Sequence, residues 1–310
     1  MENKKKILIL CGGKFAFRTI QLLAYEKFLY AIGIGKGNDI IVDALEKETE
    51  ENKMPFKSFP NKKSMSEMKD WIFSIQPDYV FSISFPFLIP EDILAYGNHK
   101  FINFHPAPLP QYRGVMPIFE VLKNQESQTA ICAHFMNAEF DEGDIIFNDP
   151  INIEEGDTYG KLTVKLSHRL SNVVLNVANM IQFGSKIPSI PQDEEKAYFY
   201  EKPQYSDTYI KWKRMSANEI NALVNACNPW NIGADTTLMG EQLKIIKSNV
   251  LPMSHDNSVP GKILKINEES IIVACADNQQ LEIEIICSDE GILKIKDWKT
   301  KEKLIGIIFN

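Results

Sequence analysis

Cysteine is scarce in this chain. The five cysteines are an odd number, lie far apart and form no Cys-x-x-Cys pair. Neither a disulfide framework nor a zinc ribbon is therefore expected, and a reducing cytoplasm is the expected location. The longest uncharged apolar runs fall far short of the ~20 residues that a membrane span needs. The charged start Met-Glu-Asn-Lys-Lys-Lys has no long apolar region after it, so we expect no signal peptide.

An excess of positive charge is also absent. The 310 residues include 34 Lys and Arg against 41 Asp and Glu, a formal net charge of −7, which disfavours a large non-specific grip on nucleic acid. What is present is an ordinary globular composition, with 44% apolar and 24% charged residues, which excludes a disordered tail, a collagen-like fibre and a coiled coil. At ~150 residues per domain, the length predicts about two domains.

The first half of the chain alternates between strand-like and helix-like segments. A continuous apolar run at residues 6–11 is typical of a strand buried on both faces, and Gly12-Gly13 separate it from a helical pattern at 16–24. The alternation continues with strands at 29–34, 78–84, 101–104, 131–137 and 144–148 and helices at 40–52 and 159–183. This spacing predicts an α/β domain with a mostly parallel sheet and helices on both faces.

The second half of the chain has a different texture. Residues 186–206 contain three prolines among charged and polar residues, which predicts a linker without regular structure. A short helix at 217–226 follows, and then come β-like segments suited to a small barrel, at 243–246, 262–266, 271–275, 281–287 and 306–309. We therefore predict an α/β domain at 1–187, a linker at 188–208 and a smaller β-rich domain at 209–310.

The most informative stretch reads Phe-Ile-Asn-Phe-His-Pro-Ala-Pro-Leu-Pro-Gln-Tyr-Arg-Gly, from residue 101 to residue 114. On a strand, Asn103 and His105 point to the same face. Open α/β sheets bind ligands at the carboxyl ends of their strands, where an amide beside an imidazole suits a developing oxyanion. Taken alone, the pair is more often a loop cap and a hydrogen-bonded buried histidine.

A second candidate is the loop Phe140-Asp141-Glu142-Gly143-Asp144. Such a loop could orient a histidine, bind a metal or simply turn, and Asp and Gly favour the turn. A metal is disfavoured because no His or Cys with ligand spacing accompanies it. The nearby His134 lies in an alternating strand pattern, which favours a structural role.

A third candidate is Cys11-Gly12-Gly13-Lys14, after the first predicted strand. It lacks the G-x-G-x-x-G spacing of a dinucleotide site and is not followed by the Gly-Lys-Ser/Thr of a P-loop. A plain strand-to-helix turn is the favoured interpretation, and an NAD-dependent enzyme is therefore disfavoured.

Together the motifs resemble a known family. Asn-x-His-Pro, Leu-Pro-x-Tyr-Arg-Gly and Asp-x-Gly-Asp are similar to the signature of the folate-dependent formyltransferases, which include methionyl-tRNA formyltransferase-like members and sugar N-formyltransferases. Ile210-Lys211-Trp212 and Asn228-Pro229-Trp230 extend the resemblance past the catalytic part. The chain departs from the family in Ala107-Pro108, where Ser-Leu is common, and in Lys211, where Asp is usual.

The resemblance implies a Rossmann-like catalytic domain, an OB-like C-terminal barrel and 10-formyltetrahydrofolate as co-substrate, with no metal. It implies that Asn103 and a protonated His105 hold the oxyanion, and that Asp141 orients His105 and helps to move protons. The residues implied for the folate donor are Phe85, Phe87, Leu88, Ile89, Pro90, Asn137, Phe140, Gly143 and Asp144. Those implied for the acceptor are Gly12, Lys14, Arg113 and Gly114, with Arg113 on an anionic group or, alternatively, in a surface salt bridge.

The charge pattern bears on which amine is formylated. From residue 205 onward, 12 Lys and Arg face 14 Asp and Glu, whereas a tRNA acceptor stem needs a basic track. We therefore expect a small anionic acceptor, such as a nucleotide-linked amino sugar, over the alternative of methionyl-tRNA. A non-catalytic protein that binds folate or a nucleotide remains a second alternative. No membrane is expected as a partner, and the chain is expected to be a monomer or a homodimer.

Overall fold

The structure is a computed structural model that describes residues 4–36, 39–96, 100–254, 257–299 and 301–310. Its contacts divide the chain into two compact units. The first contains residues 1–115, 128–152 and 163–200, and the second contains residues 116–127, 153–162 and 201–310. These units interleave along the sequence, whereas the predicted division is contiguous.

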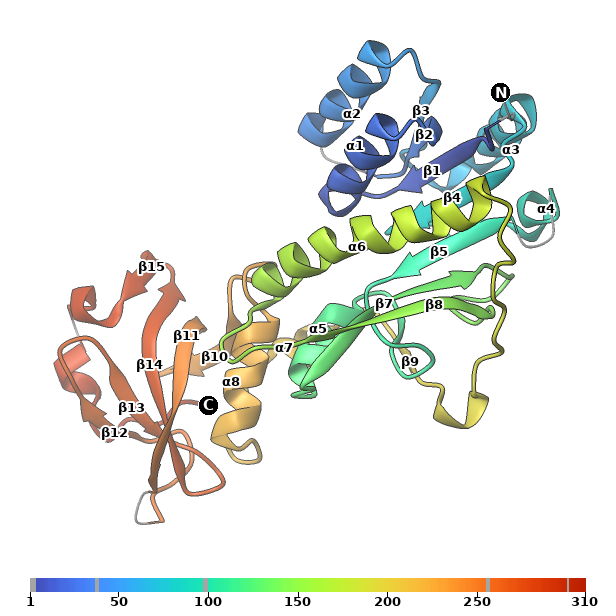
Figure 1. Ribbon diagram of the computed structural model, residues 1–310. Helices are drawn as coiled ribbons and strands as arrows, with labels where there is room; N and C mark the ends of the chain where they lie inside the picture. Colours follow the sequence, from blue (N-terminus) through green and yellow to red (C-terminus); the bar gives the residue numbers. More distant parts are fainter. Residues whose placement is uncertain (1–3, 37–38, 97–99, 255–256, 300) are drawn as a thin grey trace. The chain divides into compact units, whose positions relative to one another are not determined.

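The first unit is built on a seven-stranded sheet with the order β3-β2-β1-β4-β5-β7-β8 (Figure 1). The first five strands in that order run parallel to one another, whereas β7 runs antiparallel to both of its neighbours, β5 and β8. The strands are β1 (Ile7–Cys11), β2 (Leu29–Ile34), β3 (Phe56–Ser58), β4 (Tyr79–Ile83), β5 (Phe101–His105), β7 (Gln128–Phe135) and β8 (Ile145–Asn152). The mostly parallel sheet predicted from the sequence is confirmed.

Helices cover both faces of this sheet. They are α1 (Phe17–Tyr25), α2 (Asp39–Glu51), α3 (Met65–Ile75), α4 (Glu91–Leu94) and the part of α6 (Tyr159–Gln182) that belongs to this unit, with short 3-10 turns at η1 (Lys14–Ala16), η2 (Lys62–Ser64) and η3 (Glu194–Lys196). Every residue of β1 is fully buried, and Leu8 and Leu10 pack against α3 in one core. On the opposite face, Thr19 of α1 contacts Ser171 of α6 at 3.3 Å, so these two helices lie side by side.

The predicted linker has more structure than its prolines suggest. Residues 186–206 include η3, the short strand β9 (Phe199–Tyr200) and the start of α7 (Tyr205–Thr208). β9 pairs with β6 (Arg113–Gly114), and the Tyr112 and Tyr200 rings stack with their centroids 5.4 Å apart. The prediction of a segment without regular structure was therefore wrong, because main-chain pairing with a distant segment orders it.

The second unit contains an antiparallel sheet and two helices that pack on each other. The helices are α5 (Pro117–Lys123) and α8 (Ala217–Ala226). The strands are β10 (Ala234–Leu238), β11 (Glu241–Ser254), β12 (Ile263–Ile266), β13 (Ile271–Ala274), β14 (Gln279–Ser288) and β15 (Gly291–Lys294), followed by the turns η4 (Ile295–Asp297) and η5 (Lys301–Leu304). α8 begins where the sequence places it, with Ser216 and Glu219 forming a capping box.

The antiparallel sheet closes on itself through the C-terminal residues. Its order is β10-β11-β14-β13-β12, with β15 on β14. Phe309 pairs with Leu238 of the edge strand β10, and Ile308 pairs with Lys262, which directly precedes the other edge strand, β12. Both edges of the sheet therefore pair with the same C-terminal segment. This is the small barrel that the sequence predicts. Among the described residues, no helix combines the length and apolar character that a bilayer span requires.

Candidate active site

Three polar side chains meet at the carboxyl end of β5. Asn103 and His105 are two residues apart on this strand and therefore point to one side of it. The loop between β7 and β8, residues 136–144, brings Asp141 to both of them. Its Oδ1 accepts a hydrogen bond from Asn103 Nδ2 at 3.1 Å, and its Oδ2 lies 3.4 Å from His105 Nδ1. The structure therefore brings together the three residues that the resemblance singles out.

Asp141 is buried and held in a left-handed backbone conformation, with φ 59°. The main-chain N–H of Gly114 donates to its Oδ2 at 3.1 Å. Burial by itself raises the pKa of this carboxyl, but His105, His134 and the Gly114 N–H all favour the charged form and together bring the pKa well below its usual range. Asp141 is therefore a carboxylate at neutral pH, with both of its oxygens engaged in the cluster.

His105 is 4% exposed, and its Nε2–H donates to the carbonyl oxygen of Tyr112 at 2.7 Å. Its Nδ1 faces the Asp141 carboxylate at 3.4 Å, so each ring nitrogen lies against an oxygen that accepts hydrogen bonds. Burial lowers the pKa of His105 more than the charge of Asp141 raises it. The protonated His105 that the resemblance implies stays a prediction.

His134 is a member of the cluster that sequence reasoning left as a structural residue. It lies opposite Asn103 in the register of β5 and β7 and is 2% exposed. Its Nδ1–H donates to the Phe135 carbonyl at 2.8 Å, so its Nε2 accepts from Asn103 Nδ2 at 3.1 Å. Both N–H groups of the Asn103 amide are therefore engaged, one with His134 and one with Asp141. The alternating strand pattern that places His134 on the face of Asn103 is the signal that could have found it.

The residues expected to bind the folate donor differ in what they expose. Leu88 is 42% exposed and Phe140 49%, while Phe85 and Phe87 are half-buried and pack edge-to-face. These side chains come from two loops that follow β4 and β7, and their role in binding the donor stays a prediction. Ile89 is buried in the core, so its side chain packs away from the loop surface.

The other donor-loop residues hold the loop 136–144 in shape. Asn137 Oδ1 accepts from the main-chain N–H of Glu139 at 3.2 Å, and Asp144 Oδ2 accepts from the Ser189 hydroxyl at 2.5 Å. A Cβ at Gly143 would lie 1.9 Å from the Phe135 carbonyl oxygen, so only glycine fits there. Pro90 is half-buried and directly precedes α4.

Gly12 and Lys14, which are expected to bind the acceptor, follow the carboxyl end of β1 and lie beside the loop that follows β4. A Cβ at Gly12 would lie 1.9 Å from the Ser84 carbonyl oxygen, which shows how closely the two loops approach. Lys14 is exposed. Gly114 has φ 120° and a Cβ there would lie 2.0 Å from the Tyr200 carbonyl oxygen, so glycine is required at this position as well.

Arg113 forms salt bridges, which is the second of its two expected roles. Its own side chain is 4% exposed, whereas its partner Glu194 is 66% exposed. Its guanidinium pairs with both carboxylate oxygens of Glu194, at 2.6 and 3.0 Å, and lies 3.4 Å from Glu142. It also donates twice to Gln192 Oε1, at 2.9 and 3.2 Å. The positive charge that the sequence predicts for an acceptor anion is thus already balanced by two carboxylates.

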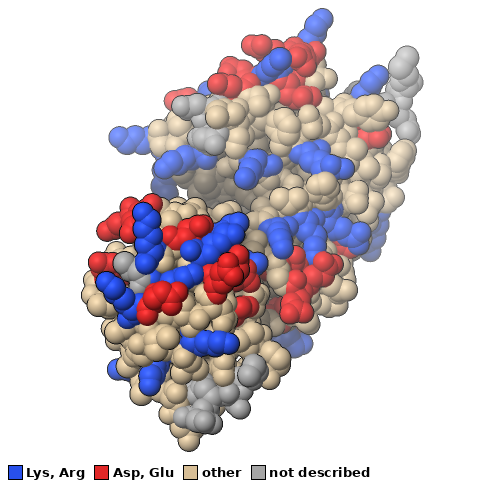
Figure 2. Space-filling model, turned by 90° about the vertical axis from the view of Figure 1, so that its left-hand side faces the viewer, with Lys and Arg blue, Asp and Glu red and all other residues tan. Residues whose placement is uncertain are grey.

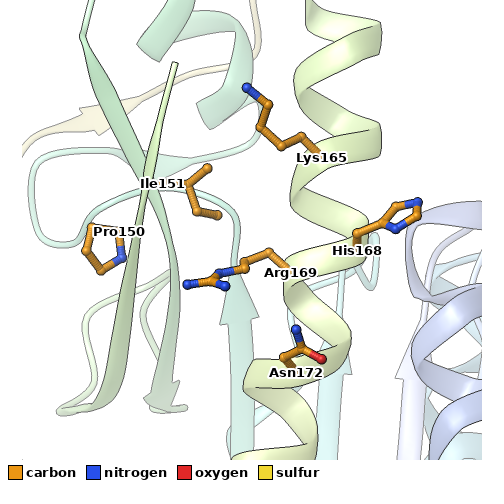
Figure 3. A pocket seen from close by; sticks show the side chains of 6 residues that line it. All are labelled: Pro150, Ile151, Lys165, His168, Arg169 and Asn172. Atoms are coloured by element: carbon orange, nitrogen blue, oxygen red, sulfur yellow. The ribbon is translucent and has the colours of Figure 1, made fainter. Parts of the chain in front are cut away.

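Two cavities of the first unit are lined by other residues. One of about 330 Å³ lies between β8 and α6, and the Arg169 side chain at its wall pairs with Asp149 at 2.6 Å (Figure 3). A second, of about 510 Å³, is lined in part by Tyr79 and Ser189. Within the described ranges, no three His, Cys, Asp or Glu side chains are arranged to hold a metal ion.

The low pKa of His105 predicts how stability depends on pH. A histidine whose pKa is lowered by folding binds fewer protons when folded than when unfolded, so its contribution is complete above its ordinary value of 6.5 and is lost as the pH falls below it. We expect the unfolding free energy to fall between pH 7 and pH 5 through this residue. Urea unfolding of wild-type protein and His105→Asn checks this, since the variant should have the flatter profile. His168→Asn, at an exposed position, is the control, and equal slopes in wild type and His105→Asn would contradict the assignment.

Comparison with known proteins places these features in context. A family model described as formyl transferase matches residues 32–178, and one described as formyl transferase, C-terminal domain, matches residues 202–303. The methionyl-tRNA formyltransferase of Staphylococcus aureus strain Newman is 32% identical over 224 residues, covering 72% of this chain and 71% of the relative. That of Acetivibrio thermocellus is 26% identical over 277 residues, covering 87% and 88%.

Solved structures show the same fold. An N-formyltransferase from Helicobacter canadensis, solved with folinic acid and dTDP-3-aminofucose, superposes with a TM-score of 0.69. The match covers 90% of this chain and 98% of that one, at 17% sequence identity. The structural likeness therefore extends over both compact units.

Proposed function

Because the chain belongs to the formyl transferase family and is a folate-dependent formyltransferase, we propose that it moves the formyl group of 10-formyltetrahydrofolate to a primary amine of a nucleotide-linked amino sugar. The observation that carries the activity is the bonded cluster of Asn103, His105 and Asp141. A protein that only binds folate would not need an ionised carboxylate between an amide and an imidazole. The cluster therefore opposes the non-catalytic alternative.

In the proposed mechanism the donor supplies an activated formyl carbon, and the residues of the chain move protons and hold charge. The acceptor amine attacks this carbon and must lose a proton, for which the Asp141 carboxylate, held beside His105, is the available base. Asn103 Nδ2 holds the formyl oxygen by releasing one of its present partners. The proton passes to the folate nitrogen as its bond to the formyl carbon breaks, and the products are a formamide and tetrahydrofolate.

Cations near the carboxyl ends of β1 and β2 support an anionic small-molecule acceptor. Lys14 and Arg18 follow β1, Lys36 follows β2, and all three are exposed. The two strand ends are neighbours, since Gly35 N donates to the Cys11 carbonyl at 2.7 Å. A diphosphate needs only a few such cations. The exposed ring of Phe199, whose centroid lies 6.4 Å from that of Phe140, offers a planar base a surface to stack on.

Positive charge in the second unit is partly balanced by carboxylates. Two lysines on its strands are paired in this way, Lys244 with Asp235 at 2.8 Å and Lys247 with Glu284 at 2.6 Å. On the face shown in Figure 2, basic side chains lie next to acidic ones. Phosphate contacts dominate the affinity for nucleic acids, so paired lysines weaken the case for tRNA.

Methionyl-tRNA is the second candidate acceptor, because the relatives at 26% and 32% identity are named methionyl-tRNA formyltransferases. The test is to incubate the protein with 10-formyltetrahydrofolate and two acceptor pools, nucleotide-linked amino sugars and methionyl-tRNA, and to follow formylation by mass spectrometry. We expect formylated sugar and unchanged tRNA. Formylated tRNA would overturn the sugar proposal and leave the formyltransferase activity in place. Donor binding without transfer to either pool would favour a binding protein or a different amine.

A further inference from the structure

Gln192 lies in the segment that the sequence predicts to be a linker, yet its side chain touches the loop that carries Asp141. Its Nε2 donates to the main-chain carbonyl of Asp141 at 2.7 Å and to that of Gly143 at 2.8 Å. Its Oε1 accepts twice from Arg113. We infer that Gln192, held by Arg113, is a positioning residue that keeps Asp141 in its catalytic place. This inference rests on the proposed function.

The orientation of the Gln192 amide follows from its partners. The guanidinium of Arg113 can only donate, and the carbonyls of Asp141 and Gly143 can only accept. A flipped amide would place its NH₂ against the guanidinium and its oxygen against two carbonyl oxygens. Gln192 therefore links the buried guanidinium of Arg113 to the loop 136–144. A carboxylate in its place could accept hydrogen bonds from Arg113 but could not donate to the loop carbonyls.

Asp141 needs such support because its backbone conformation is unfavourable. At φ 59° a residue other than glycine is strained, by about 1–3 kcal/mol, and persists only where the surroundings hold it. Gly143 is confined on its other side by the Phe135 carbonyl. Gln192 binds the carbonyls on both sides of Glu142, so it bridges the strained turn.

Arg113 is anchored firmly enough to serve as the fixed end of this connection. Four of its five N–H groups are used, by Gln192 and Glu194. Its main chain pairs with β9, since Arg113 N donates to the Tyr198 carbonyl at 3.1 Å. The next residue, Gly114, donates its N–H to Asp141 Oδ2. Residues 113–114 thus fix Asp141 twice, directly through a main-chain N–H and indirectly through Gln192.

This connection assigns Arg113 a role other than the acceptor contact that the sequence predicts. An acceptor anion would have to displace Glu194 from a guanidinium that is 4% exposed. The two roles predict different kinetics. Loss of an acceptor contact raises KM for the amine, whereas loss of a support for Asp141 lowers kcat.

The test compares Gln192→Glu and Gln192→Met with Gln21→Glu, which makes the same change at an exposed position of α1. Glu keeps an acceptor for Arg113 and loses the donors to the loop, and Met loses both. We expect both Gln192 variants to lower kcat by about 10–100-fold, with KM for the amine within about threefold, because a misplaced catalytic group costs this much. On an Asp141→Asn background, the same substitutions should lower kcat by less than about twofold further.

Hydrogen exchange gives a readout that does not depend on the acceptor. Main-chain amides of residues 136–144 should exchange faster in both Gln192 variants and at the wild-type rate in Gln21→Glu. Unchanged exchange, a raised KM with normal kcat, or losses that multiply on the Asp141→Asn background would each overturn the inference. If wild-type protein formylates no acceptor, the proposed function fails, and the exchange comparison still decides whether Gln192 holds the loop.

Discussion

Asp141→Asn is expected to lower kcat by about 10³-fold, the middle of the range for a group that moves a proton in the rate-limiting step. Asp141 is charged and accepts from Asn103 on one oxygen and from Gly114 on the other. An asparagine places an NH₂ where one of these oxygens now stands, so a donor would face a donor. It also removes the negative charge beside His105, so the base that takes the proton of the amine is lost.

The measurement is single-turnover formyl transfer with saturating donor and acceptor, because binding then drops out of the rate. Glu139→Gln, an exposed carboxylate in the same loop, is the matched control and should retain wild-type turnover. The Asp141→Asn variant should bind a non-reactive folate with the affinity of the wild type. Turnover within about tenfold of wild type would remove Asp141 from the chemistry and leave it a role in loop structure.

Periodicity alone was enough to predict the elements with continuous or regularly spaced apolar residues. All five residues of β1 are buried, and α6 buries Leu162, Leu166 and Leu170 on one stripe. α5 was not predicted, because six of its seven residues are buried and no stripe shows. β10 reads Ala-Asp-Thr-Thr-Leu and has little apolar character. Its Asp235 is buried, with its carboxylate bonded to Thr208, Asn231 and Lys244.

The site shows the same division between local and distant information. The two-residue period of a strand places Asn103 beside His105, and the resemblance supplies Asp141. The contacts of Gln192 with Asp141 span 51 residues and leave no mark in local composition. The charge state of His105 also depends on burial, which no motif records. Tertiary packing thus decides which of the polar residues are free to meet a ligand.

Asn103→Ala is expected to lower kcat by about 10²–10³-fold, the usual cost of removing one donor to a developing oxyanion. The present bonds of Asn103 sharpen this expectation. Its two N–H groups reach His134 Nε2 and Asp141 Oδ1 in the absence of substrate, so donation to the formyl oxygen exchanges one protein partner for a substrate partner. The amide is therefore held in place before the reaction, and its loss also leaves two buried acceptors without a donor.

Comparison with Asn103→Asp separates these two effects. Aspartate has the same shape but puts a second carboxylate at hydrogen-bonding distance from Asp141, where like charges raise the pKa of one of them. We expect Asn103→Asp to be at least as impaired as Asn103→Ala at neutral pH and to recover partly as the pH is lowered, because a protonated carboxyl can donate. Asn148→Ala, at an exposed position of β8, should match wild type. If Asn103→Asp turns over faster than Asn103→Ala at high pH, Asn103 is not a donor in the reaction, and its place between His134 and Asp141 is structural.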